Sequence, residues 1–383
     1  SGPVNDRACL HIDNCYYIPN LKLISHRCKT NTQSATAFRG FGGPQGMFGI
    51  ETVIEEIAND IGKDPLDVRL LNIYKDPAVS GNPATMVTQY GQTIADWVGD
   101  KVIDQVASEA KYRERRDSVN AFNKVNKRRK RGLALVPLKF GISFTATMLN
   151  QGGALLNIYM DGSVSCNHGG TEMGQGLNTK MAQVCADGLG IDISYVRVTG
   201  TDTQKVPNAS ATSASSGADI NGAAIMNATA QMRARLAPVA ANMLGCKDAD
   251  VSFANNMAHG GGKSVAWTAV AKQAWMDRVG LSVTGFYMTP EIKYDFATLT
   301  GHAFYYYCYG ASVSEVEIDT RTGEYWIKAV DIVHDAGKSI NPAIDKGQIE
   351  GGYVQGMGWL TMEECIWDKK GKFLTHGPST YKI

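Results

Sequence analysis

The chain has 383 residues, a hydrophobic fraction of 44% and a formal net charge of +1. That length is enough for two or more packed units, and a near-neutral charge gives no electrostatic reason to expect nucleic acid or an acidic membrane surface as a partner. The eight cysteines form no Cys-x-x-Cys pair, which argues against a zinc or iron–sulfur site inside the chain.

The first notable segment is the loop 36–45, which combines Phe38, Arg39 and Phe41 with three glycines ahead of an apolar helical pattern. Glycine lets backbone N–H groups approach a ligand closely, and a following helix N-terminus favours anionic groups. Phenylalanine rings offer faces to a flat ring. The same composition also suits a tight loop with one packed aromatic, so both interpretations are open on this segment alone.

Two helices follow this loop. Apolar residues recur at helical spacing from Met47 to Ile61, and Gly62 stands where a helix ends. Asp64 and Pro65 then provide a cap and a first residue for a second helix. The basic segments 111–116 and 127–131 come next, and a charge run of this kind is more typical of a solvated helix end than of a nucleic-acid patch or nuclear signal. We place a junction between two subdomains there, with residues 1–130 before it and 131–383 after it.

The second part reads as strands mixed with helices. Segments 154–160 and 163–166 flank Asp161-Gly162 and predict one hairpin, and segments 313–318 and 325–330 predict another. Between them, apolar residues from Ile225 to Met243 trace a long helical face. The sequence therefore predicts an α+β architecture with ligand-facing loops at the ends of the elements.

Four motifs resemble the xanthine dehydrogenase/aldehyde oxidase family of molybdenum hydroxylases. The loop 36–45 is similar to its molybdenum-cofactor region, and segments 167–180, 206–215 and 341–351 are similar to three further motifs, in the family's order. The resemblance covers nearly the whole chain. It implies a molybdenum-cofactor-binding domain, with 1–130 as the C-terminal part of a first molybdopterin-binding subdomain and 131–383 as an incomplete second one.

The loop 169–180 also invites comparison with a nucleotide-binding P-loop, because Gly169 and Gly174 have the required spacing. Gln175-Gly176 replaces the Lys-Ser/Thr pair that would hold phosphate and magnesium, which argues against a nucleotide triphosphatase. A glycine turn running into a helix can still hold a pterin phosphate through N–H groups, and Gln175 can hydrogen-bond a cofactor edge. A Gln175 that only braces the loop is the other interpretation.

The resemblance implies a set of cofactor-binding residues. Hydroxyl-rich segments such as 210–215 often serve only as caps and turns, but the family likeness places the backbone around Ala214 against the pterin. Gln348 corresponds to a pocket residue, or is simply a polar residue on a half-buried helix. No side chain is expected to ligate the metal, which should lie near Arg39 and Ala214. The implied cofactor-binding residues are Phe38, Arg39, Gly174, Gln175, Ser213, Ala214, Ser215 and Gln348.

The chemistry implied is that of a molybdenum centre with oxo and sulfido ligands, held by the dithiolene of a molybdopterin. In the family a glutamate activates the metal-bound hydroxyl, which attacks an electron-poor carbon while hydride passes to the sulfido group. Electrons then leave through [2Fe–2S] clusters and FAD, which are expected in partner domains or a partner subunit. The implied reactions convert hypoxanthine to xanthine and xanthine to urate.

Four residues match the substrate positions of purine-oxidising members. Phe41 and Phe144 match two phenylalanines that hold a planar purine, and Arg7 matches an arginine that stabilises charge on the ring. Thr145 can hydrogen-bond the ring from beside Phe144. A related hydroxylase acting on aldehydes or other N-heterocycles is the alternative.

The chain departs from the family pattern at its catalytic centre. The family's catalytic glutamate belongs to a Gly-Glu-Pro-Pro type motif a few dozen residues beyond a segment like 378–383, so no catalytic residue is assigned here. Glu172 and Glu350 lie in motifs with other roles, and neither is taken as the base. We therefore expect part of a larger cytoplasmic enzyme, a dimer or higher oligomer with an iron–sulfur and FAD partner and without nucleic-acid or membrane partners. An inactive cofactor-binding module is a further alternative.

Overall fold

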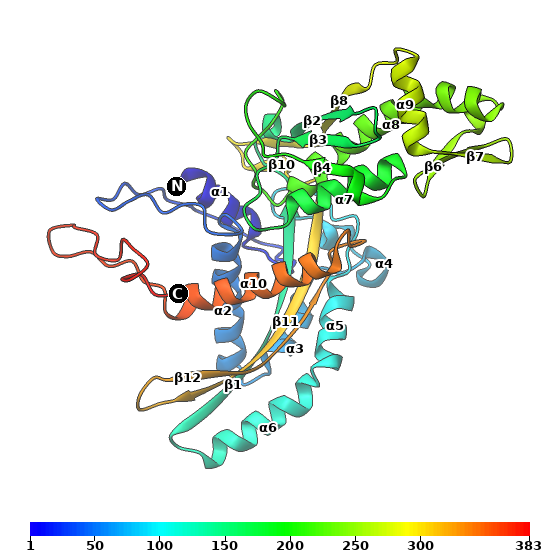
Figure 1. Ribbon diagram of the computed structural model, residues 1–383. Helices are drawn as coiled ribbons and strands as arrows, with labels where there is room; N and C mark the ends of the chain where they lie inside the picture. The colour runs from blue at the N-terminus through cyan, green and yellow to red at the C-terminus, as the bar shows by residue number, and fades with distance from the viewer. The chain divides into compact units, whose positions relative to one another are not determined.

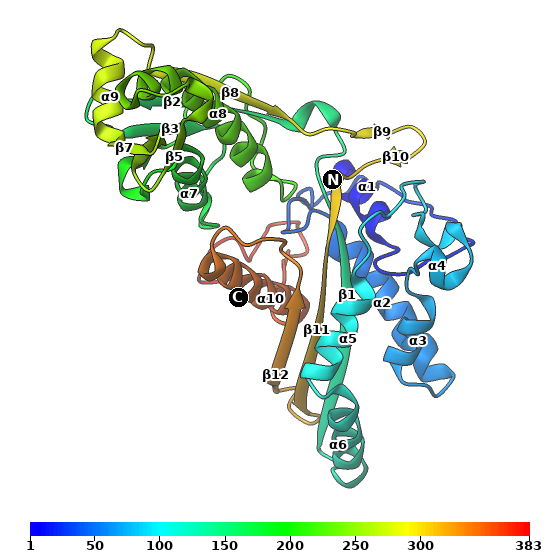
Figure 2. The ribbon, with the colours of Figure 1, turned by 90° about the vertical axis from the view of Figure 1, so that its right-hand side faces the viewer.

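The computed structural model describes residues 1–383 and contains two compact units (Figures 1 and 2). Unit 1 comprises Ser1–Ile142, Lys293–Gly337 and Met357–Ile383, and unit 2 comprises Ser143–Ile292 and Lys338–Gly356. Both units mix helices with sheets, which confirms the predicted α+β class. No helix has the length and apolar composition of a membrane-spanning segment.

Unit 1 is built on one long antiparallel sheet with the strand order β1-β11-β12. Its strands are β1 (Arg129–Ile142), β11 (Tyr306–Asp319) and β12 (Tyr325–His334), and β9 (Lys293–Asp295) pairs with β10 (Thr300–His302) in a separate hairpin. Its helices are α1 (Gly2–His11), α2 (Gly43–Asp60), α3 (Pro65–Asn72), α4 (Pro77–Ser80), the 3-10 helix η1 (Pro83–Met86), α5 (Gly99–Glu109) and α6 (Tyr112–Val125).

The helices predicted after the first loop are confirmed. Helix α2 buries Met47 and Ile54 of the predicted pattern together with Ala58, whereas Ile57 and Ile61 are exposed. The Asp64 side chain accepts a hydrogen bond from the Leu66 N–H at 2.8 Å, so Asp64 caps α3 as expected. The hairpin predicted from segments 313–318 and 325–330 is also confirmed, with both strands longer than expected.

The basic segments lie along the sheet of unit 1. Arg128 forms an ion pair with Asp319 at 2.6 Å, and Arg131 pairs with Glu317 at 2.9 Å, across the β1–β11 ladder. Arg115 on α6 bridges Glu315 and Asp331. The arginines of 128–131 are therefore ion-paired at the start of β1 and do not form a helix end, whereas 111–116 opens α6, as expected of a helix end. Because β1 continues to Ile142 within this sheet, the compact units divide the chain differently from the boundary expected after residue 130.

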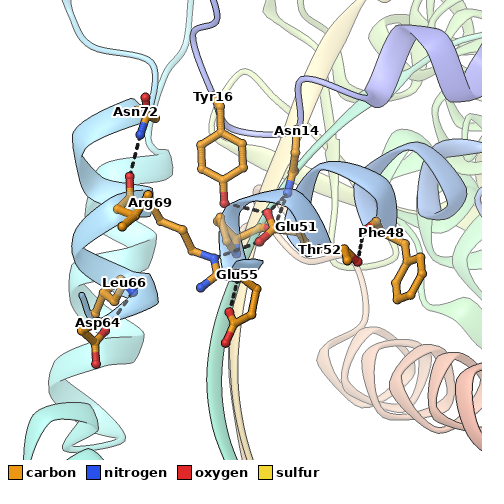
Figure 3. A network of polar contacts seen from close by, with 12 residues as sticks. Asn14, Tyr16, Phe48, Glu51, Thr52, Glu55, Asp64, Leu66, Arg69 and Asn72 are labelled. Atoms are coloured by element: carbon orange, nitrogen blue, oxygen red, sulfur yellow. Dashed lines mark hydrogen bonds and ion pairs between the residues drawn. The ribbon is translucent and has the colours of Figure 1, made fainter. Parts of the chain in front are cut away.

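A buried carboxylate joins three segments of unit 1 (Figure 3). Glu51 Oε1 on α2 accepts hydrogen bonds from Asn14 Nδ2 at 2.7 Å and from the Tyr16 hydroxyl at 2.6 Å. Its Oε2 accepts from Arg69 Nε on α3 at 2.8 Å. Asn14 also donates to the Pro137 carbonyl of β1 at 2.8 Å, so the network reaches the sheet. These contacts fix α2, whose N-terminus follows the loop 36–42.

Helices α1 and α2 approach each other at two glycines. A Cβ on Gly42, where φ is +105°, would lie 2.0 Å from the Val4 carbonyl oxygen. A Cβ on Gly46 would lie 2.3 Å from the Ala8 carbonyl oxygen. Only glycine permits this backbone contact, which sets the distance between α1 and the start of α2.

Unit 2 has a four-stranded sheet, ordered β4-β3-β2-β8, and a small three-stranded sheet, β5-β6-β7. The strands are β2 (Gln151–Ile158), β3 (Val164–His168), β4 (Val196–Val198), β5 (Ser252–Ala254), β6 (Met257–Gly260), β7 (Lys263–Ala266) and β8 (Ser282–Met288). The helices are η2 (Thr147–Leu149), α7 (Leu177–Leu189), η3 (Ile193–Tyr195), α8 (Gly217–Leu244), η4 (Asp248–Asp250) and α9 (Trp267–Met276). Helix α10 (Pro342–Thr361) contributes its first part, to Gly356, to unit 2.

The core of unit 2 lies between the four-stranded sheet and α8. The predicted hairpin at Asp161-Gly162 is formed by β2 and β3. The predicted apolar face of α8 is buried at Ile225, Met232 and Leu236. A Cβ on Gly285 of β8 would lie 2.1 Å from the Ala224 carbonyl oxygen, so α8 rests directly on the strand.

Replacing Glu51 by glutamine should destabilise unit 1 by about 3 kcal/mol, because it leaves the 3% exposed Arg69 side chain without its main carboxylate partner. The midpoint of urea unfolding measures the effect. Glu56→Gln, at an exposed position of the same helix, is the control and should change stability by less than about 0.5 kcal/mol. Equal midpoints for the two variants would contradict the importance of this network.

Two glycines of α2 provide a matched pair. Gly46→Ala should destabilise unit 1 by about 1–3 kcal/mol, since the new methyl group would overlap the α1 backbone. Gly49→Ala should stabilise the same helix by about 0.5–1 kcal/mol, because no atom lies within 4 Å of its added Cβ and alanine favours the helix. Urea unfolding of both variants tests this, and the same direction of change in both would refute the α1–α2 contact.

Candidate cofactor-binding site

The predicted site residues belong to both units. Unit 1 contains Arg7, Phe38, Arg39 and Phe41. Unit 2 contains Phe144, Thr145, Gly174, Gln175, Ser213, Ala214, Ser215 and Gln348.

In unit 1 the loop before α2 is a tight turn with unusual backbone conformations. Ala37 and Phe41 have φ angles of +57° and +52°, and the Phe41 N–H donates to the Phe38 carbonyl at 2.7 Å. Such left-handed conformations in residues other than glycine cluster at functional sites. The Phe41 side chain is 37% exposed and Arg39 is exposed, whereas the Phe38 ring packs on Trp359 with 5.0 Å between centroids. Phe38 therefore has a partner within the chain.

Arg7 on α1 is held in an aromatic setting. Its guanidinium carbon lies 5.0 Å from the ring centre of Phe140 and 4.6 Å from that of Phe304, and Nη2 donates to the Gly141 carbonyl at 2.5 Å. The residue is only 6% exposed, and burial lowers the pKa of Arg7 to about 10. Arg7 therefore remains a cation at neutral pH, stabilised by the ring faces.

His11 is a residue that the sequence did not single out, and it fixes Arg7 from one turn away. Its Nδ1–H donates to the Arg7 carbonyl at 3.0 Å, and its Nε2 accepts from the Gly141 N–H at 3.1 Å. Burial, followed by the charge of Arg7, lowers the pKa of His11 well below its usual value, so the ring is neutral. Arg7 and His11 are four residues apart, and this spacing in the sequence indicates that the two side chains lie on one face of a helix.

In unit 2 the loop before α7 is closed by its own side chains. Glu172 Oε1 accepts from the N–H groups of Gly174 at 2.9 Å and Gly176 at 3.0 Å, and Oε2 accepts from Asn178 at 2.9 Å. Gln175 accepts from the Met173 N–H at 2.5 Å and donates to the Thr171 carbonyl at 2.8 Å. Gln175 thus braces the loop, which is one of the two roles that the sequence allowed for it.

The second hydroxyl-rich loop meets the first. The Thr171 N–H donates to Thr212 Oγ1 at 2.9 Å, and a cavity of about 10 Å³ between the loops, lined by Gly169, Ser213 and Ser216 among others, has room for one water molecule. Ala214 and Ser215 have φ angles of +58° and +59°. The side chain of Ser216, the N-cap residue of α8, makes no hydrogen bond to the first turn of that helix.

Helix α10 brings the fourth motif onto α7. Lys180 of α7 forms an ion pair with Asp345 at 2.5 Å, and Asn341 Nδ2 donates to Gln183 Oε1 at 2.9 Å. A Cβ on Gly176, where φ is +74°, would lie 2.6 Å from Ile344. Three of the four motifs are therefore joined within unit 2, and half-buried Gln348 lies on the same helix as these contacts.

Phe144 is anchored by an asparagine that the sequence did not single out. The Phe144 N–H donates to Asn150 Oδ1 and the Phe144 carbonyl accepts from Asn150 Nδ2, both at 2.8 Å. Asn150 is 1% exposed, whereas Phe144 and Thr145 are half-buried. The two bonds fix the backbone at Phe144.

These features fit a pterin-type cofactor that brings its own metal ligands. The loops offer glycine backbone, hydroxyls and the left-handed pair Ala214–Ser215, where N–H groups can face an anionic or polar ligand. Around Gly174, where φ is +99°, no atom lies within 4 Å of an added Cβ, so a ligand can approach the backbone. The chain contains no group of three histidine, cysteine, aspartate or glutamate residues arranged to hold a metal ion.

Known proteins similar to this chain also point to a pterin-type cofactor. Two family models, each described as a molybdopterin cofactor-binding domain, match residues 1–73 and 105–383. The chain is 44% identical over 384 aligned positions to xanthine dehydrogenase of Emericella nidulans, and 44% identical to xanthine dehydrogenase/oxidase of Gallus gallus. Each alignment covers 100% of this chain and 26% of the relative, so the chain spans about a quarter of their length.

Solved structures share the fold. Quinoline 2-oxidoreductase from Pseudomonas putida 86 aligns with a TM-score of 0.80 and 22% identity over 99% of this chain and 48% of that chain. The aldehyde oxidoreductase from Desulfovibrio desulfuricans aligns with a TM-score of 0.75 and 24% identity over 93% of this chain and 35% of that chain. Because the two models together match most of its length, the chain belongs to the molybdopterin cofactor-binding domain family.

Proposed function

We propose that the chain is the cofactor-binding part of a xanthine dehydrogenase whose complete form converts hypoxanthine to xanthine and xanthine to urate. The observation that carries this proposal is the 44% identity, over the whole chain, with proteins named xanthine dehydrogenase. We assign Arg7, Phe41 and Phe144 to the substrate positions that the family resemblance implies for purine-oxidising members, and a purine is the substrate proposed on that basis. We also propose a cytoplasmic, dimeric or larger enzyme, acting in purine catabolism.

The cofactor is held, in this proposal, by backbone groups more than by side chains. The N–H groups of Ala214, Ser215 and the first turn of α8 provide donors for its anionic part, and Gly174 allows close approach to the pterin. When bound, molybdopterin with its oxo and sulfido ligands supplies the two-electron oxidation and the oxygen atom transferred. The other proposed cofactor contacts are Phe38, Arg39, Gln175, Ser213 and Gln348.

The substrate residues act by position and charge. The Arg7 guanidinium, fixed by the Gly141 carbonyl and two ring faces, can stabilise negative charge that develops on a purine. Phe41 of unit 1 and Phe144 of unit 2 each offer a ring to a flat substrate, and Thr145 adds a hydroxyl for hydrogen bonding. The fixed position of the Arg7 guanidinium lowers the entropic cost of orienting the ring.

The general base and the electron acceptors are proposed to lie outside this chain. Glu172 is already bonded to three backbone N–H groups, and Glu350 is an exposed residue 3.7 Å from Lys346, so neither is a suitable base. Iron–sulfur clusters and FAD are assigned to partner domains or a partner subunit. The assignment of residues 1–130 and 131–383 to two cofactor-binding subdomains remains a prediction.

The first test is the metal and pterin content of the chain, purified from cells that make molybdopterin. Stoichiometric molybdenum, with pterin fluorescence after oxidation, would support the proposal that the chain binds the cofactor. The chain alone should show no purine-dependent dye reduction, because the base is supplied from elsewhere. Purine turnover by the chain alone would contradict the assignment of the base.

The second test concerns the substrate and uses the complete enzyme. Arg7→Gln should lower kcat/KM for xanthine about 100-fold or more, through loss of about 3 kcal/mol of charge stabilisation, and retain activity on an aromatic aldehyde. Arg113→Gln, at a surface ion pair of α6, is the control and should leave both activities unchanged. Molybdenum content checks that each variant is intact. If Arg7→Gln leaves purine turnover unaltered, the purine assignment loses its main support.

A further inference from the structure

The loop before α7 has the glycine spacing and the N–H groups of an anion-binding loop, but the chain itself fills it. The Glu172 carboxylate accepts from the N–H groups of Gly174, Gly176 and Asn178 at 2.9–3.0 Å. Gly176 is the N-cap of α7 and Asn178 lies in its first turn, so these donors belong to the positive end of the helix. The carboxylate therefore lies where a bound phosphate would receive the same donors.

We propose that Glu172 is an internal anion that holds this loop closed and excludes phosphate and other anionic groups from the start of α7. Each N–H donates to the carboxylate already, and a second anion at hydrogen-bonding distance from the same donors would face a like charge within about 4 Å. As far as it concerns the cofactor, the proposal rests on the proposed function: Glu172 is then a specificity-determining residue that keeps the cofactor's anionic part off α7.

Other polar side chains of this region also have partners within the chain. Gln175, at the place where a phosphate-binding loop carries its lysine, bonds to Met173 and Thr171 of the same loop. Lys180, in the first turns of α7, is engaged by Asp345. His168, which hydrogen-bonds the Asn178 side chain at 3.1 Å, also faces the Glu172 carboxylate, but burial lowers the pKa of His168, so it is neutral at neutral pH. The backbone N–H groups are therefore the hydrogen-bond partners of the carboxylate.

The ionisation of Glu172 follows from the same geometry. Partial burial raises the pKa of its carboxyl group, but the N–H groups of Asn178, Gly176, Gly174 and Leu177 outweigh that effect and lower it overall. Its contribution to stability is therefore present in full above the unfolded-state pKa and is lost as the pH falls through the lower folded-state pKa.

The experiment measures phosphate binding to the isotopically labelled chain by the amide resonances of Gly174, Gly176 and Asn178, without any cofactor. In the unchanged chain inorganic phosphate at neutral pH should cause no saturable shift of these signals. In Glu172→Ala the freed donors should give saturable shifts, with an apparent affinity at least about tenfold higher than in the unchanged chain. Glu172→Gln, which keeps the side-chain shape and removes the charge, should also gain phosphate binding.

The matched control is Asp192→Asn. Asp192 also accepts a backbone N–H two residues ahead, from Ser194 at 2.9 Å, and lies in the same unit. This variant loses one carboxylate without opening the α7 loop, so it should not bind phosphate at the three amides.

The proposal is overturned if the unchanged chain binds phosphate at these amides as tightly as the variants, or if neither Glu172 variant binds it. An acid titration of the unchanged chain is a second readout: the three amide signals should move together with one ionisation below the usual glutamate value. Independent movement of the signals would also overturn the proposal. If the chain passes these tests and the complete enzyme, made in cells that produce molybdopterin, holds no molybdenum, the proposed function alone is refuted.

Discussion

Burial of the Glu51 carboxylate is the constraint on which unit 1 depends. A buried charge is costly unless it is paired and fully hydrogen-bonded, and here the partners come from two separate segments: Asn14 and Tyr16 after α1, and Arg69 on α3. Neither segment can move away without leaving the carboxylate short of partners. Because α2 carries Glu51 and begins directly after the loop 36–42, the same interaction fixes the base of that loop.

Glycine packing completes this arrangement. Gly42 and Gly46 let the backbone of α1 touch α2, and α1 carries Arg7 and His11. The guanidinium of Arg7 is then enclosed by Phe140 and Phe304, and the neutral His11 ring ties its helix to β1. The position of one cation in unit 1 thus depends on a buried carboxylate, two glycines and a histidine that do not themselves face a ligand.

The two main helices of unit 2, α7 and α8, differ in how their N-termini are capped. The start of α7 is filled by the Glu172 carboxylate, whereas the start of α8 has no side-chain cap and follows the left-handed residues Ala214 and Ser215. Such conformations cost about 1–3 kcal/mol each and persist where the surrounding structure or a ligand holds them. The two helix starts therefore differ in that a carboxylate of the preceding loop caps α7, whereas the N-cap residue of α8 makes no such bond.

Local pattern was enough for the elements that depend on neighbouring residues. Apolar spacing and the Asp64-Pro65 cap predicted α2 and α3, and Asp161-Gly162 predicted the β2–β3 hairpin, because helical periodicity and turn geometry are short-range properties. The four motifs likewise identified the family, and the α+β class followed. The extent of β1 and the pairing of its basic residues with β11 did not follow, since strand pairing joins residues far apart in the chain.

The sequence by itself determined the type of ligand site, through rare combinations of glycine, hydroxyl and aromatic residues in a fixed order. Only the tertiary structure decided which partners those groups have within the chain. Gln175 and Glu172 hydrogen-bond backbone groups of their own loop, and Phe38 packs on Trp359, whereas Phe41 is partly exposed. The physical reason is that the partners of a side chain depend on neighbours in space, which residues far apart in the chain provide.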